Sequence, residues 1–222
     1  MIEGFRGRFK GQTVYVFGSG ASLDHYDRNF FDDKICVATN RVGIRYGLKN
    51  YYICSHNHLA HQYNKLHEVT APIICPDRDC DRLESEILPD EPNVFRFRAS
   101  RQWRKKFNVK EHWPKNDTLL VGSAGVHTSM HFAQWAGAST IILVGADNGL
   151  LDDKTNFDEY MKPPYMKPEN ARGTDRSWPA WEQHTREVAN KIRSLGCRVY
   201  SLSPFINWNL EGHVYRSVAS IN

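Results

Sequence analysis

Two short turns rich in glycine and serine are the part of this sequence best suited to hold a phosphate. Each opens a segment with helical spacing, so free backbone N–H groups and the positive end of a helix dipole would face a bound anion. The first turn has Leu23 where the dinucleotide fingerprint has its third glycine, and no P-loop lysine follows, which argues against NAD and against a Walker-type ATP site. A plain strand-to-helix turn is the alternative. The residues concerned are Gly18, Ser19, Gly20 and Ser22 in the first turn and Ser123, Ala124 and Gly125 in the second.

Polar side chains follow the apolar runs that we interpret as strands. Asn40 follows one such run, and Asp147 and Asn148 follow another. In a parallel sheet these side chains would meet the two turns at one edge. Asp147 would bind a ribose hydroxyl, hold Mg²⁺ through water, or cap a turn together with Asn148. The sequence therefore predicts one nucleotide-binding crevice built from separate stretches of the chain.

A general base is expected on the helix predicted at residues 178–195. His184 lies near two tryptophans and Glu182, and burial together with a carboxylate would set its pKa near neutrality. Tyr160 and Tyr165 precede this helix in a segment that also carries lysines and arginines, which would close on an anionic leaving group and stabilise its charge. A helix histidine without a catalytic role and a solvated loop are the respective alternatives.

Two groups of histidines have spacings compatible with a metal site. His56, His58 and His61 form an HxHxxH cluster, but no cysteine or carboxylate stands beside it at ligand spacing. His127 and His131 lie four residues apart on one helix face, without the glutamate of an HExxH motif. We therefore expect no metal site, and we expect one histidine of the second pair to pack in the core with its imidazole hydrogen-bonded.

Composition limits the class of protein. The chain has 222 residues, of which 41% are hydrophobic and 12% aromatic, which suits a single domain with a sizeable core. No run approaches the roughly 18 apolar residues of a membrane span and no signal peptide is evident, so we expect at most peripheral membrane contact. Five cysteines without CxxC spacing fit buried thiols in a reducing, cytoplasmic compartment. The net charge of +4 suits an anionic ligand, but no Lys/Arg run exceeds three residues, so no nucleic-acid partner is expected.

Strands that alternate with helices predict the fold. Right-handed crossovers place helices on both faces of a parallel sheet, so we expect an α/β, Rossmann-like three-layer sandwich with a mostly parallel sheet, in which residues 1–222 form a single domain. Residues 98–117 are interpreted as an inserted arm, and residues 150–177 as a lid-like loop. The expected strands are residues 13–17, 34–38, 51–54, 71–75, 94–97 at a sheet edge, 140–145 and 197–202, and the expected helices are residues 23–31, 59–68, the run after Gly125, and 178–195.

Several segments together resemble a bacterial glycosyltransferase group, the family 42 sialyltransferases. They are VFGSGASL at residues 16–23, VATN at 37–40, SAGVHTSMHFAQWAGASTIILVGAD at 123–147, and DRSW at 175–178 with RVYSLSP at 198–204. Motility accessory factors and archaeal 6-hydroxymethylpterin diphosphokinases carry a similar pattern. The resemblance implies transfer of a nonulosonic (sialic) acid or another sugar from a CMP-activated donor to a glycan or protein hydroxyl, without a cofactor.

The resemblance also implies roles for particular positions. The family's Gly-Asn-Gly-Pro-Ser-Leu loop, which lies against the donor nucleotide, corresponds to residues 18–23, with Ser19 in place of the asparagine. The family's asparagine after the second strand matches Asn40, and its Ser-Gly-Val helix start is similar to residues 123–126.

The catalytic positions depart from the family pattern. Gly149 replaces the tyrosine that stabilises the departing phosphate, which leaves Tyr160 or Tyr165 for that role. Glu182 replaces the family's general-base histidine, and His184 stands two residues later. The resemblance therefore implies that the base is either His184 or Glu182.

Two other functions fit the same sequence. A diphosphokinase acting on a hydroxymethylpterin would use ATP and Mg²⁺, with Asp147 organising the metal and tryptophans stacking on the pterin. A non-catalytic nucleotide- or glycan-binding module would bind its ligand without turnover. A homo-oligomer is compatible with either function.

Overall fold

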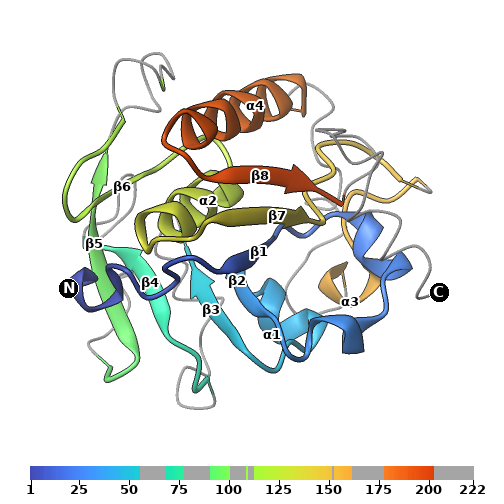
Figure 1. Ribbon diagram of the computed structural model, residues 1–222. Helices are drawn as coiled ribbons and strands as arrows, with labels where there is room; N and C mark the ends of the chain where they lie inside the picture. The colour runs from blue at the N-terminus through green and yellow to red at the C-terminus, as the bar shows by residue number, and fades with distance from the viewer. Residues whose placement is uncertain are drawn as a thin grey trace.

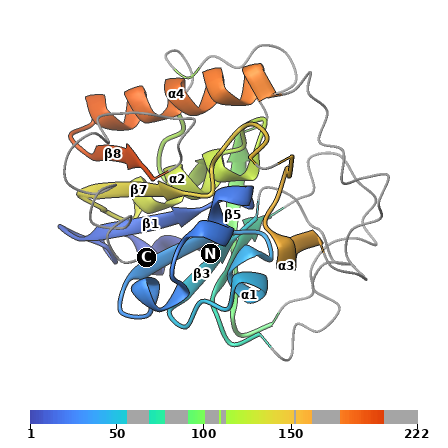
Figure 2. The same ribbon diagram turned by 90° about the vertical axis from the view of Figure 1, so that its right-hand side faces the viewer.

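An eight-stranded parallel sheet runs through the protein and has helices on both faces (Figures 1 and 2). The computed structural model describes residues 1–55, 69–77, 91–100, 109, 113–151, 153–161 and 178–202. The strand order is β6-β5-β4-β3-β2-β1-β7-β8, and every pairing between these strands is parallel. The expected α/β, Rossmann-like three-layer architecture is confirmed.

The central strand β1 shows why the sheet needs two covering layers. Val14 and Val16 face one hydrophobic core and Tyr15 and Phe17 face the other, so the strand is apolar on both sides. The strands are β1 (Thr13–Phe17), β2 (Ile35–Thr39), β3 (Tyr51–Cys54), β4 (Ile73–Pro76), β5 (Val94–Ser100), β6 (Thr118–Leu120), β7 (Thr140–Val144) and β8 (Arg198–Ser201).

Helices α2 (Gly125–Trp135) and α4 (Trp178–Ser194) cover one face of the sheet (Figure 1). Helix α2 packs against β1, β2, β3, β6 and β7, and α4 packs against α2 and β8. The opposite face carries α1 (Val42–Tyr46), α3 (Asp158–Met161) and the 3-10 helices η2 (Ala21–His25) and η3 (Arg28–Phe31). A further 3-10 helix, η1 (Glu3–Phe5), precedes β1.

The strand order reverses at β1, and this reversal opens a crevice. The chain winds outward from β1 to β6 and then returns through α2 to β7, which pairs with β1 on its other side. Because η2 follows β1 on one face and α2 precedes β7 on the other, the starts of both helical segments flank the carboxyl ends of the central strands. Ligands of open α/β sheets bind at such a switch point.

Some local expectations were wrong. Residues 23–31 form two 3-10 helices instead of one helix, because the backbone between them is extended at Tyr26 and Asp27, and the Asp27 carboxylate accepts a hydrogen bond from the Asn29 N–H. Strand β5 runs past the predicted residues 94–97 and pairs with β6, so β6, which the sequence did not predict, is the edge strand on that side of the sheet.

Other expectations lie outside the described residues. The predicted helix at 59–68, the histidines at 56, 58 and 61, and most of the predicted arm are among them. Across the described ranges, no helix combines the length and the apolar character that crossing a membrane requires.

Candidate functional site

A cavity of about 410 Å³ lies at the carboxyl ends of β1, β2 and β7, between the loops that follow β1 and β7 and the start of α2. Nearly all the residues predicted to bind a nucleotide line it, although they come from distant parts of the sequence. Ser22 is buried beside them, and its exposed fraction is 2%. The predicted residues in the lining are Gly18, Ser19, Gly20, Asn40, Ser123, Ala124, Gly125, Asp147, Asn148 and Tyr160.

The first glycine-serine turn is fastened to the loop that follows β7. The N–H of Gly18 donates to the Val144 carbonyl and that of Gly20 to the Gly145 carbonyl, both at 2.8 Å. A Cβ atom on Gly18 would approach the Gly145 carbonyl oxygen to 2.5 Å, and one on Gly20 would collide with the Asp147 carboxylate. The two glycines are therefore required by the contact between the two loops, whether or not a phosphate binds there.

Asp147 holds this turn in place. It is 2% exposed, and both of its carboxylate oxygens accept hydrogen bonds from Ser22: Oδ2 from the backbone N–H at 2.8 Å and Oδ1 from the hydroxyl at 2.5 Å. Three roles were expected for Asp147, and the geometry favours the role of a turn cap. The turn that it caps is the one at Ser22, whereas the sequence suggested the turn at Asn148. Asn148 stabilises its own turn, with φ of 51° and an amide that donates to the Ala146 carbonyl.

Asn40 presents its amide to the cavity from the end of β2. Its backbone has a φ of 52°, in the left-handed region that asparagine tolerates. The Ser55 hydroxyl donates to its side-chain oxygen at 2.9 Å. The amide nitrogen is therefore the end of this side chain suited to donate to a ligand.

The start of α2 is anchored by a buried histidine. His127 accepts a hydrogen bond from the Ala124 N–H at Nδ1, and its Nε2 lies 2.9 Å from the Thr185 hydroxyl. That hydroxyl donates its proton to the Trp181 carbonyl, so His127 must donate through Nε2 and is neutral. This chain of bonds ties α2 to α4 directly below the cavity.

His131 is also a core residue rather than half of a metal pair. Its Nδ1 accepts a hydrogen bond from the Leu120 N–H at 2.8 Å, and burial lowers its pKa to about 3. We had expected one histidine of this pair to pack in the core, and both do. No three His, Cys, Asp or Glu side chains among the described residues gather closely enough to hold a metal ion.

His184 contacts the cavity through Ser123. Its Nδ1 lies 2.7 Å from the Ser123 hydroxyl oxygen. Burial lowers the pKa of His184, and the nearby Glu187 carboxylate opposes this shift, so the imidazole is neutral at pH 7 and able to accept a proton.

Glu182 occupies a different side of α4. Two residues along a helix correspond to a rotation of roughly 200°, so Glu182 and His184 cannot point the same way. The Glu182 carboxylate instead pairs with Arg186, whose Nε and Nη2 lie at 2.9 and 2.7 Å. Of the two predicted bases, only His184 has a described contact with the cavity wall.

The first part of the predicted lid forms one wall of the cavity. Phe157 is fully buried and packs against Tyr160, with ring centroids 5.6 Å apart. The Ser19 hydroxyl donates to the Asn156 side-chain oxygen at 2.6 Å, and the Phe157 N–H donates to the Ser19 carbonyl. Tyr165, the other tyrosine candidate, lies outside the described residues.

Several residues of the site were missed by the sequence reasoning. Arg41 is 4% exposed, and its guanidinium lies 4.9 Å from the centre of the Tyr160 ring. Burial raises the pKa of Tyr160, while the charge and the hydrogen bond of Arg41 oppose the rise. The sequence did carry a signal for Arg41, because it is a cationic residue that directly follows Asn40 at the end of a strand. Thr155, Asn156 and Trp181, unlike Arg41, line the cavity itself and were also missed, and Thr39 lines it beside Asn40.

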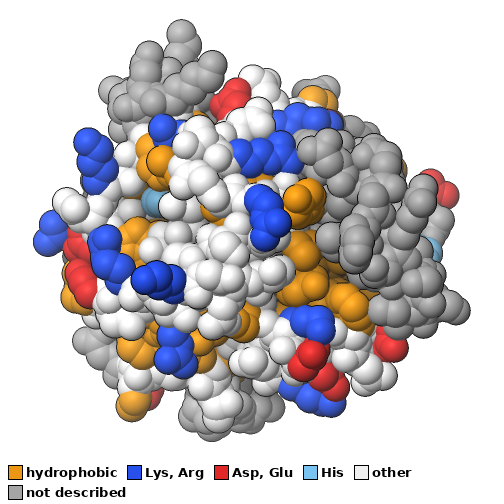
Figure 3. Space-filling model, in the orientation of Figure 1, with side chains coloured by type: hydrophobic (Ala, Val, Ile, Leu, Met, Phe, Trp, Pro, Cys, Tyr) orange, Lys and Arg blue, Asp and Glu red, His pale blue; other side chains and the backbone are white. Residues whose placement is uncertain are grey.

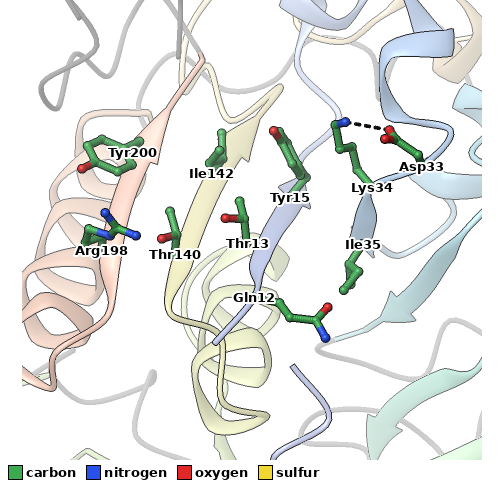
Figure 4. A pocket seen from close by; sticks show the side chains of 10 residues that line it. All are labelled: Gln12, Thr13, Tyr15, Asp33, Lys34, Ile35, Thr140, Ile142, Arg198 and Tyr200. Carbon is green, nitrogen blue, oxygen red and sulfur yellow. Dashed lines mark hydrogen bonds and ion pairs between the residues drawn. The ribbon is translucent and has the colours of Figure 1, made fainter. Parts of the chain in front are cut away.

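A larger hollow, of about 910 Å³, lies near the amino ends of β1, β2, β7 and β8 (Figure 4). It includes Tyr15, Ile142 and Tyr200, and its Lys34 pairs with Asp33 at 2.7 Å. None of the predicted site residues lines it, and the starts of η2 and α2 lie at the other edge of the sheet. Among the residues coloured by type on the face seen in Figure 3, the Lys and Arg side chains are scattered and not gathered in one patch. The smaller cavity is therefore the candidate site.

Comparison with family models, curated proteins and solved structures finds no match for this chain.

Proposed function

We propose that the protein is a glycosyltransferase that moves a sugar, a nonulosonic acid by the resemblance noted above, from a CMP-activated donor to a hydroxyl group of a glycan or protein. One observation carries the proposal: the two glycine-serine turns share a cavity, and a histidine contacts its wall. Such a transfer needs donors for a phosphate and a base for the acceptor hydroxyl, and this rim supplies both.

The donor phosphate is assigned to the start of α2. Gly125 and Val126 are the first two residues of this 11-residue helix and line the cavity, so their N–H groups have no partner within the helix and could donate to a bound anion. Ser123 adds a hydroxyl. Trp181 offers a flat surface on which the cytosine ring of CMP can stack, and Asn40 offers an amide N–H that can donate to the nucleotide.

The transfer is a displacement at the anomeric carbon of the sugar. The acceptor oxygen forms a bond to this carbon as the bond to the CMP oxygen breaks, and the acceptor proton passes to His184. Because its pKa is raised, Tyr160 stays protonated and donates a hydrogen bond to the departing phosphate, with the positive charge of Arg41 nearby. This scheme uses no metal ion.

Calorimetry with CMP, CDP, UDP and ATP plus Mg²⁺, side by side, tests the nucleotide. Heat with CMP and none with ATP is the expected result, and the reverse overturns the proposal. With a CMP-linked sugar as donor, His184→Ala lowers kcat by about 10²- to 10⁴-fold and leaves CMP affinity nearly unchanged. Glu182→Ala, on the same helix but paired with Arg186, is the matched control and leaves kcat unchanged.

Trp181 in the cavity wall also favours a second candidate, the ATP-dependent 6-hydroxymethylpterin diphosphokinase, because an indole is a suitable surface on which to stack a pterin. That reaction would require Mg²⁺, whereas both oxygens of Asp147 are engaged by Ser22. Metal dependence of the ligand heat separates the two candidates. Binding heat without turnover, unchanged in His184→Ala, would instead indicate a binding module.

A further inference from the structure

Ser123 belongs to two environments at once. It lines the cavity immediately before α2, and its hydroxyl oxygen lies 2.7 Å from Nδ1 of His184 on α4. The two helices are held in register beneath it by the bond between His127 and Thr185. The contact between Ser123 and His184 is therefore built into the packing of α2 against α4.

Only one proton can lie between these two atoms, and there are two arrangements. If Ser123 donates, its only O–H is used on His184, and the neutral imidazole carries its proton on Nε2. If His184 donates from Nδ1, the Ser123 O–H is available to a ligand, and the lone pair of the imidazole is on Nε2. An anion at the start of α2 accepts from the Ser123 hydroxyl and so selects the second arrangement.

We propose that Ser123 couples the two substrates: the bound phosphate sets the tautomer of His184 and so makes Nε2 the basic nitrogen. The inference rests on the proposed function for the role of His184 as base. In the transfer, the acceptor proton passes to Nε2, and the resulting imidazolium strengthens its Nδ1–H bond to the Ser123 oxygen. Ser123 is a positioning residue, and the donor binds before the acceptor is deprotonated.

Long-range ¹H–¹⁵N spectra of the full chain with ¹⁵N-labelled histidine test the coupling. Comparison with His184→Gln identifies the His184 signals, which are recorded with and without CMP. We expect CMP to move His184 to the Nδ1–H tautomer in the wild type and in Ser123→Thr, which keeps the hydroxyl, but not in Ser123→Ala. Ser139→Ala, at the amino end of β7, is the control and behaves as the wild type.

Retention of the Nε2–H tautomer with CMP bound, or an equal response in Ser123→Ala, overturns the inference. Inorganic phosphate and ATP serve as parallel probes, since the coupling requires only an anion at this turn. If inorganic phosphate or ATP changes the tautomer of His184 while CMP gives no binding heat, the proposed donor is wrong but the coupling holds. Absence of binding by all three probes overturns both.

Kinetics gives a second readout. Ser123→Ala lowers kcat by about 10- to 100-fold, the range expected for loss of a hydrogen bond to a charged group, and Ser123→Thr recovers most of it. Because the imidazolium also loses an acceptor, the acid limb of the rate profile moves to lower pH in Ser123→Ala. A purely structural role for Ser123 would leave the position of this limb unchanged.

Discussion

At the scale of single residues, the site depends on which side chains are neutral. His184 has a lowered pKa because it is partly buried, and Tyr160 has a raised pKa for the same reason. At neutral pH, burial thus keeps the His184 imidazole, which contacts the lining residue Ser123, neutral and the Tyr160 hydroxyl of the cavity lining protonated. In the proposed donor complex, Arg41 beside Tyr160 and the backbone at the start of α2 would balance the charge of the phosphate.

The pH dependence of transfer follows from His184. Only the neutral imidazole accepts a proton, so activity is full above its pKa and falls as the pH drops through it. Because burial places this pKa below the ordinary 6.5, we expect the midpoint of the acid limb of kcat/KM to lie below pH 6.5. A profile of kcat/KM against pH checks this, and a midpoint above 6.5 would contradict it.

At the scale of elements, the loops after β1 and β7 act as one unit. Gly18 and Gly20 lie against Gly145 and Asp147 so closely that neither position has room for a side chain. Residues 153–161, which come after the β7 loop, pack on the loop that follows β1. Asn156 and Phe157 in this segment both form hydrogen bonds with Ser19. This side of the cavity wall is therefore built by contacts within the protein itself.

Gly20→Ala tests the contact between the loops. The added methyl group meets the Asp147 carboxylate and the Gly145 carbonyl, and we expect a loss of about 1–3 kcal/mol in the free energy of unfolding. Gly4→Ala, where a Cβ meets nothing within 4 Å, is the matched control and changes it by less than about 0.5 kcal/mol. Urea unfolding of both variants gives the comparison, and equal stabilities would argue against the packing described.

Phe157→Ala tests whether the wall is part of the core. Removing this fully buried ring leaves a cavity and destabilises the protein by about 3–5 kcal/mol, and it weakens CMP binding because Tyr160 loses its packing partner. Leu150→Ala, at a side chain that is 42% exposed, changes stability by less than about 0.5 kcal/mol. A solvated lid would instead give the same small effect at both positions.

At the scale of the whole molecule, a buried histidine on the α2 side of the sheet makes the stability of the fold depend on pH. The core under α2 contains His131, which stays neutral when folded because its pKa is lowered to about 3, whereas it titrates near 6.5 when unfolded. The unfolded chain therefore binds more protons below pH 6.5, and stability falls as the pH drops from 6.5 toward 3.

His131→Asn removes this titration and keeps an acceptor for the Leu120 N–H. In the wild type, each pH unit below 6.5 lowers the free energy of unfolding by up to about 1.4 kcal/mol through His131. The free energy of unfolding of the variant therefore falls less steeply between pH 6.5 and 4. Urea unfolding at several pH values measures the slope. His25→Asn, at an exposed histidine, is the control. An equal slope of the free energy of unfolding against pH in both variants would show that His131 does not cause the pH dependence.

The sequence by itself determined the α/β class of the sheet, most strand boundaries and ten of the residues that line the cavity. Apolar runs and polar strand ends are local patterns, and a parallel sheet brings all its carboxyl ends to one edge. It was for this reason that Ser19, Asn40, Ser123 and Asp147 were expected together. Strand β6 was missed because three residues are too short to show a period.

Only the tertiary structure decided what each side chain does. Asp147 accepts hydrogen bonds from Ser22, 125 residues away, and no local pattern encodes that pairing. Likewise, His184 rather than Glu182 meets Ser123 because the rotation of α4 is set by its packing on α2, which buries Thr185 and Val188. Helical spacing gives the angle between two side chains, but only packing against a neighbour fixes which of them faces the site.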